Sequence, residues 1–233
     1  MCMSSTASAV EPWELTTPDP SAARIRVAFD LVRSGGVSGP AGEFFRNKDE
    51  CYARFGSQAA SNYGKHADVG LHLIVARDRD GAQIGGVAIY DRILQTPLPL
   101  EIAIGHEPCV LAEIKTWAAE RSVVEFSGLW ISEDWRKTGL SKQLLLIAMS
   151  AAHHLQASKV VGFSHHHVMD FYRTIGLLPH PNAQRFYYPH APYVSMMVWG
   201  DPVGFSTMPE NAMAEVRAYV KNLECGSRLE WSP

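Results

Sequence analysis

The chain has no long apolar run and no targeting pattern at its start. None of its stretches approaches the roughly 18 consecutive apolar residues that a membrane-spanning helix needs. Its first twenty residues contain neither the basic start nor the apolar centre of a secretory signal. We therefore predict a cytoplasmic protein without a membrane span.

Positive charge and cysteine are also scarce. Lysine and arginine together number 21 against 24 acidic residues, the formal net charge is -3, and no segment concentrates the positive charge. A nucleic-acid-binding surface needs such a concentration, so we expect no nucleic-acid partner. The four cysteines lie far apart, without the spacing of a metal site or the signature of a catalytic thiol. We expect reduced thiols and no metal centre.

The chain does contain enough apolar material for a sizeable core, because 46% of its residues are hydrophobic and 10% are aromatic. Leu71–Arg77 and Gln83–Asp91 flank the turn sequence DRDG at 78–81, which predicts an antiparallel hairpin. Val123–Ile131 (VVEFSGLWI) is typical of a mostly buried strand. Further along, apolar residues at helical spacing predict a long helix from about residue 140 to residue 155.

The remaining pattern completes an alternating order of helices and strands. A mixed α/β sheet flanked by helices suits this order. We expect residues 1–20 to be disordered and 96–108 to be a connection. The other expected elements are helices at about 22–32, 44–63, 110–121, 170–176 and 207–223, with strands at 159–163, 185–188 and 193–198.

The segment WRKTGLS at 135–141 joins the strand at Val123–Ile131 to the long helix. The first-turn amides of a helix have no partner within the helix, and its dipole is positive at that end, so a phosphate or pyrophosphate can bind there. Gly139 allows a ligand to approach the backbone, and Arg136 and Lys137 add positive charge. The segment therefore predicts a site for a phosphorylated ligand.

Other interpretations of this turn are a nucleotide site and a structural turn. A dinucleotide fingerprint needs three glycines and an acidic residue about 20 positions later, and a P-loop needs two glycines before Lys and Ser or Thr. Neither pattern is present. An ordinary strand-to-helix turn with a solvated Arg-Lys pair remains an alternative.

The same segment resembles motif A of the GNAT superfamily of acyl-CoA N-acyltransferases. That motif is Gln or Arg, two residues, Gly, one residue, then Gly or Ala, and here it is represented by Arg136, Gly139 and Ser141. Residues 170–177 (DFYRTIGL) are similar to the late helix of the superfamily. The likeness covers about 123–199, with a weaker extension back to about residue 72.

The resemblance implies a fold and a domain organisation. The expected fold is a mixed α/β domain at 21–204, with a central sheet splayed between Val123–Ile131 and 159–163, and the pantetheine arm of the cofactor in the split. Residues 205–233 are expected to form a C-terminal helix and tail. A capping-box pattern at Thr207 and Glu210 predicts where that helix begins.

The resemblance also implies roles for individual residues. Glu125 corresponds to a Glu that often acts as general base, and Tyr172 to a Tyr that protonates the leaving thiolate. Each has a structural alternative, because Glu125 can anchor a neighbouring loop and Tyr172 can be an interior aromatic of an amphipathic helix. A Glu inside an apolar strand is expected to have a raised pKa. The implied acyl-CoA-binding residues are Leu129, Trp130 and Ile131 through their main chain, with Arg136, Lys137, Thr138, Gly139, Leu140 and Ser141 at the turn.

The run His165, His166 and His167 follows the second splayed strand. Consecutive histidines point in different directions and rarely complete a metal site, and no acidic or cysteine partner stands at ligand spacing. One of them, with His166 as the first candidate, could face the acceptor pocket as base or substrate contact. Plain loop histidines are the alternative.

The function implied by the resemblance is N-acyl transfer, most simply from acetyl-CoA, to a small-molecule primary amine by direct attack in a ternary complex. An alternative is the branch of N-acyl amino acid and acyl-homoserine-lactone synthases with long-chain acyl donors, although Gly128 stands where that branch usually has Arg. A second alternative is a domain that binds acyl-CoA without turnover. A homodimer is possible, as is common in the superfamily.

Overall fold

The computed structural model describes residues 27–33, 39–54, 71–94, 97–105, 107–187, 191, 193–225, 227 and 229–233. The expected disorder of residues 1–20 lies outside these ranges. In the described part, a sheet of nine strands has the order β6-β8-β5-β4-β3-β2-β1-β9, with β7 paired to β8. The strands are β1 (Val27–Arg33), β2 (Leu71–Arg77), β3 (Gln83–Asp91), β4 (Val123–Ile131), β5 (Lys159–His165), β6 (Leu178–Pro179), β7 (Phe186–Tyr187), β8 (Val194–Gly200) and β9 (Leu229–Trp231). The helices are α1 (Gly39–Ala53), α2 (Pro99–Ala103), α3 (Pro108–Glu120), α4 (Leu140–His154), α5 (Met169–Arg173) and α6 (Glu210–Glu224).

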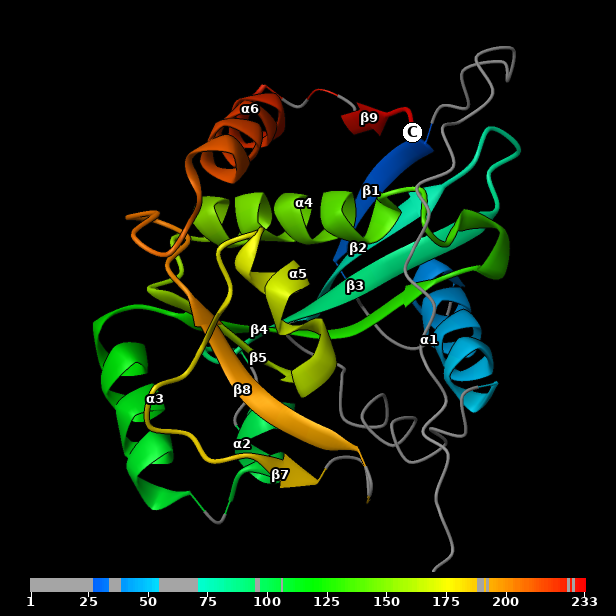
Figure 1. The fold of residues 1–233 in the computed structure, drawn as a ribbon. Coiled ribbons are helices and arrows are strands. Elements are labelled where there is room, and N and C mark those ends of the chain that lie inside the picture. The colour runs from blue at the N-terminus through cyan, green and yellow to red at the C-terminus, as the bar shows by residue number, and fades with distance from the viewer. Residues whose placement is uncertain are drawn as a thin grey trace, which may run out of the picture.

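The helices cover the two faces of this sheet. Figure 1 shows α4 across one face with α6 beyond it, and α1 and α3 on the opposite side. The apolar residues of α4 and α6 share one core cluster with β3 and β4, and those of α1, α2 and α3 share a second cluster with the other side of the same strands. The expected mixed α/β sheet flanked by helices is therefore confirmed.

The middle of the sheet is split between β4 and β5. These strands run parallel, whereas the other described pairs are antiparallel. Their pairing covers only the first part of each strand and ends at Glu125 and Val161. Beyond that point the strands diverge, which confirms the expected splay.

The first strand corrects a prediction. A helix was expected at about 22–32, but residues 27–33 form β1, which pairs with β2 on one side and with β9 on the other. Val27 and Phe29 are both buried in the core cluster beside α4. The apolar spacing suits either a helix or a strand, and the partner strands decide the outcome.

Two further predictions about local structure are wrong. The expected connection at 96–108 contains the short helix α2, which begins at Pro99. Helix α6 begins at Glu210 after Pro209, without the expected side-chain cap, because the Thr207 hydroxyl accepts a hydrogen bond from the Asp201 amide at 3.1 Å instead. The expected C-terminal helix itself is present and packs against α4.

Candidate functional site

A cavity of about 430 Å³ occupies the split between β4 and β5. Its walls come from both faces of the sheet, since Phe44 and Tyr90 belong to the core cluster of α1, while Leu145 and Leu177 belong to that of α4. Most of the lining is apolar. The polar side chains in the lining are those of Lys48, Tyr52, Tyr90, Ser127, Ser164, His165, His167, Tyr172 and Tyr193.

The β4 wall contains a bulge. The pairing of β3 with β4 shifts between Gly86 and Ala88, so that Gly128 and Leu129 together face a single residue of β3. Gly128 has φ +63°, a conformation that favours glycine. A bulge leaves backbone groups outside the ladder, and here they border the cavity.

Helix α1 closes the cavity beside this bulge. The Tyr52 hydroxyl donates a hydrogen bond to the Leu129 carbonyl at 2.9 Å. One helical turn earlier, the stem of Lys48 lies so close to Gly128 that a Cβ built there would be 3.1 Å from Lys48 Cδ. Lys48 is only 3% exposed. The sequence analysis identified neither residue, because nothing local to 39–53 connects it with a segment some 80 residues later.

Tyr172 reaches the cavity from α5, on the other side of the split. Burial raises the pKa of its phenol, and a hydrogen bond with the Ser164 side chain lowers it in part. Burial also raises the pKa of Tyr52, and Tyr172 contributes to that rise. Both phenols line the cavity, Tyr52 from α1 and Tyr172 from α5.

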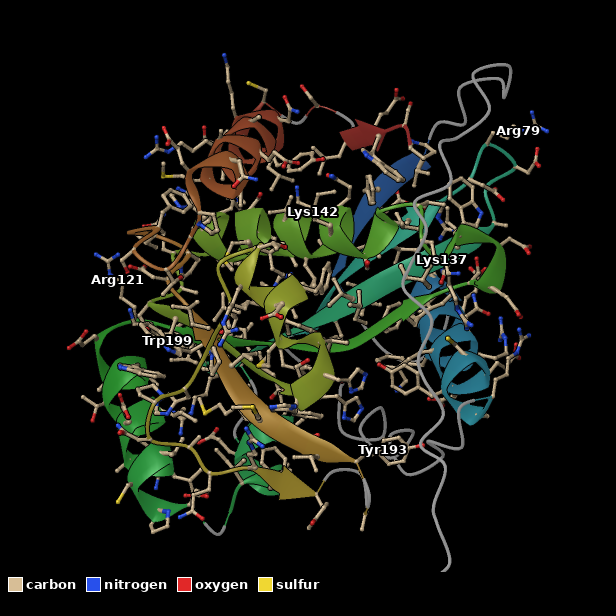
Figure 2. All side chains as sticks on the ribbon, viewed as in Figure 1. Arg79, Arg121, Lys137, Lys142, Tyr193 and Trp199 are labelled. Carbon is tan, nitrogen blue, oxygen red and sulfur yellow. The ribbon has the colours of Figure 1, made fainter. Side chains whose placement is uncertain are left out.

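His165 and His167, two of the three consecutive histidines, line the cavity. Their rings are stacked with centroids 5.7 Å apart, and Tyr193 lies 5.5 Å from the His165 ring, at the N-terminal end of β8 (Figure 2). Burial, followed by the neighbouring His167, lowers the pKa of His165. His166, the first candidate from the sequence, is exposed and is absent from the lining.

Glu125 is fully buried beside the cavity and is absent from its lining. Its Oε2 accepts a hydrogen bond from the Leu100 amide at 2.8 Å, near the start of α2, and its Oε1 has no hydrogen-bond partner in the part of the chain that the structure describes. Burial raises its pKa to about 8. The expected rise is thus present, and the contact with Leu100 fits the structural alternative, while the role as base stays a prediction.

The sequence predicts an anion site at the turn before α4, and two residues of this turn have a positive φ. Gly139, with φ +91°, precedes the first residue of α4, and Lys137 also has a positive φ of 64°. The Thr138 hydroxyl closes the turn by donating to the Trp135 carbonyl at 2.8 Å. Figure 2 shows Lys137 at this turn. Arg136 precedes this turn, and its guanidinium lies 4.0 Å from Cys51 Sγ of α1, while Ser141 belongs to the first turn of α4.

The predicted main-chain contacts on β4 lie between this turn and the cavity. Leu129 lines the cavity, whereas Trp130 and Ile131 continue β4 toward the turn. The Trp130 side chain is buried against Phe44 on the α1 side, and the Ile131 carbonyl accepts from Cys51 Sγ at 3.6 Å. An extended ligand could therefore pass from the turn along β4 into the split.

The described side chains include no group of three or more His, Cys, Asp or Glu residues placed to hold a metal ion. Within the same ranges, no helix combines the length and the apolar character that a membrane crossing requires.

The comparisons with known proteins rest on structure alone, since no protein-family model and no curated protein matches the sequence. FeeM, an N-acyl amino acid synthase from uncultured soil microbes, has a TM-score of 0.61 and 11% identity over 82% of this chain and 98% of its own. BjaI, a CoA-dependent acyl-homoserine lactone synthase, has a TM-score of 0.60 and 11% identity over 84% of this chain and 90% of its own. An acyl-CoA N-acyltransferase from Pseudomonas aeruginosa has a TM-score of 0.54 and 15% identity over 75% of this chain and 99% of its own. The splayed sheet, the bulged β4 and these likenesses together show that the chain has the GNAT fold.

Proposed function

We propose that the protein is an N-acyltransferase that moves an acyl group from an acyl-CoA thioester to a primary amine. The observation that carries this proposal is the cavity in the split, because one cavity reaches the β4 bulge, the Tyr172 phenol and both faces of the sheet. Donor and acceptor can therefore meet in it at the same time. This arrangement suits direct attack in a ternary complex.

The donor would extend from the turn before α4 to the bulge. The first-turn amides of α4, with Arg136 and Lys137, would bind the pyrophosphate of CoA. Backbone groups of Leu129 to Ile131 would hydrogen-bond the amides of the pantetheine arm. Backbone N–H groups that the bulge leaves outside the β3–β4 ladder would stabilise the negative charge that develops on the thioester oxygen during attack.

Two protons must move in this reaction. The amine nitrogen forms a bond to the thioester carbon and loses a proton to a base, while the C–S bond breaks and the thiolate accepts a proton. Tyr172 is the proposed donor of that second proton, since its phenol lines the cavity and its raised pKa keeps the phenol protonated before the thiolate forms. For the first proton, Glu125 is the base that the resemblance implies, and His165 is the alternative inside the cavity.

The apolar lining of the cavity suits an acyl group longer than acetyl. The cavity, of about 430 Å³, also has to hold the end of the pantetheine arm and the acceptor, so this preference rests on its apolar lining and not on its volume. FeeM and BjaI, which belong by name to the classes of N-acyl amino acid and acyl-homoserine lactone synthases, have the same fold. Acetyl transfer, as implied by the motif, is the second candidate, and binding without turnover is the third.

Calorimetric titration of the full chain with acetyl-CoA, octanoyl-CoA and palmitoyl-CoA tests the donor. We expect saturable binding that is tighter for octanoyl or palmitoyl than for acetyl. Turnover with a mixed panel of amines then separates an enzyme from a binding domain. Binding of none of the three thioesters would contradict the proposal.

A variant at Ser141 tests the location of the phosphate site. Ser141→Glu places a negative charge in the first turn of α4, which favours the helix but repels a phosphate. It should weaken binding about tenfold or more. Ser141→Ala is the control and should bind normally. Gly139 is less suitable, because its φ of +91° strains any other residue.

A further inference from the structure

Lys48 is a buried cation in the wall of the cavity. It is 3% exposed, and lysine is almost never fully buried unless it is paired. Its Nζ lies 3.1 Å from Asp49 Oδ1, and Asp49 is 41% exposed. The Phe45 ring centroid lies 5.4 Å from the same nitrogen.

The pairing of Lys48 is incomplete. An ammonium has three donors, yet among the described residues Asp49 is the only polar partner of Nζ, and the buried Asp49 Oδ1 lacks hydrogen-bond geometry toward it. Desolvating a charge is unfavourable unless hydrogen bonds compensate for it. The side chain nevertheless lines the cavity instead of extending into solvent. A ligand with negative charge would supply the missing acceptors.

The position of Lys48 restricts where that negative charge sits. Its stem contacts Gly128 at the bulge, where the proposed thioester carbonyl lies. The acceptor amine must reach the same carbonyl, so the group bound by Nζ and the attacking amine are only a few bonds apart. In an α-amino acid, the amine and the carboxylate share one carbon atom, which matches this restriction.

We propose that Lys48 binds the carboxylate of the acceptor, and that the acceptor is an α-amino acid. This inference rests on the proposed function, because it assigns the acceptor of the same site. The donor phosphates are placed at the other end of β4, beside α4, so the two anionic groups bind at separate points. Phe44, Phe45 and Tyr90 supply apolar and aromatic walls for the acceptor side chain.

Binding of amino acids and their amides to the full chain tests the inference. The chain, saturated with coenzyme A, is titrated calorimetrically with L-leucine, L-methionine, L-phenylalanine, L-tyrosine and L-tryptophan, and with the amide of each. The amide keeps the amine and the side chain but lacks the negative charge. At least one amino acid should bind about tenfold or more tightly than its amide, as expected for a charge-assisted hydrogen bond.

Three variants assign the preference to Lys48. Lys48→Met should abolish the difference between acid and amide, and Lys48→Arg should retain a preference because it keeps the charge. Lys115→Met, the same change at an exposed position of α3, should behave like the wild type. The wild-type comparison remains decisive if Lys48→Met does not fold. Equal affinity for acid and amide, binding of none of the five amino acids, or a preference that survives in a folded Lys48→Met would each overturn the inference.

Turnover separates this inference from the proposed function and from a purely electrostatic role. If Lys48 stabilises the oxyanion instead, Lys48→Met lowers kcat equally for the acid and the amide, and the inference fails. Transfer to both acceptors without any effect of Lys48 removes the inference and leaves the acyltransferase. Selective binding of the acid without transfer from any acyl-CoA leaves the carboxylate site and removes the acyltransferase.

Discussion

Glu125 links the stability of the fold to pH. The side chain is fully buried, and its pKa is raised from 4.5 to about 8. Burial is the main cause; the hydrogen bond from Leu100 lowers the pKa, and the neighbouring Glu101 raises it. Between these two pH values the native protein keeps a proton that the unfolded chain has lost. The contribution of this proton to the free energy of unfolding is fully present below pH 4.5 and is lost as the pH rises to about 8.

The size of the effect follows from the displacement of the pKa. At about 1.4 kcal/mol for each pKa unit, it corresponds to about 5 kcal/mol of unfolding free energy. Glu125→Gln removes the titration and keeps an oxygen that can accept from the Leu100 amide. Its buried NH2 group has an unfavourable contribution, but this contribution does not change with pH. The informative quantity is therefore the difference between the two proteins as a function of pH.

Urea denaturation at pH 5, 7 and 9 measures this difference. Relative to the wild type, Glu125→Gln should gain stability as the pH rises, by several kcal/mol in total and most steeply below about pH 8. A difference that stays constant from pH 5 to pH 9 would refute the reasoning. A difference that moves the other way would show that the ionised carboxylate stabilises the fold.

Other substitutions test the site and the packing around it. Tyr172→Phe should leave donor binding unchanged and lower kcat about a hundredfold, as expected for loss of a general acid. Turnover assays of the wild type and the variant with the same acyl-CoA check this. If His165 is the base, His165→Gln should lower kcat/KM and remove the acidic limb of the pH profile of kcat/KM. If Glu125 is the base, Glu125→Gln should have these two effects instead. Gly86→Ala should lower the unfolding free energy by about 1–3 kcal/mol in urea titrations, because the new Cβ would lie 2.7 Å from the Ile74 carbonyl and 2.8 Å from the Phe44 ring. An unchanged value would contradict the close packing of α1 on β3.

The central elements were predictable from the sequence because their signals are local. The turn at 78–81 and the alternation around it specify the β2–β3 hairpin, in which Asp78 Oδ1 accepts from the Asp80 and Ala82 amides. The apolar run of β4 and the helical stripe of α4 were equally clear. Strand β1 was missed because its identity depends on β2 and on β9, which come from distant parts of the chain.

The candidate site divides in the same way. The turn before α4 and Tyr172 were identified because short motifs specify them. Lys48 and Tyr52 were missed, since their relation to Gly128 and Leu129 exists only after α1 packs on β4. The choice between His165 and His166 also needed the structure, because β5 continues to His165 and directs alternate side chains to opposite faces.

The split in the sheet explains why structural and functional requirements meet in the same strands. Gly162 follows Val161, the last residue of β5 that pairs with β4, and a Cβ at Gly162 would lie 2.9 Å from the Phe126 carbonyl, so a larger residue would not fit where this pairing ends. Further along β4, the bulge at Gly128 shifts the register of its pairing with β3. Buried backbone groups need hydrogen-bond partners, and beyond this point neither strand supplies them to the other. Tyr52 and Cys51 supply such partners to the Leu129 and Ile131 carbonyls, and in the proposed function an extended donor with amide groups would pair with backbone groups of β4 that have none. In the proposed function, the opening between β4 and β5 is therefore the feature that would align donor and acceptor.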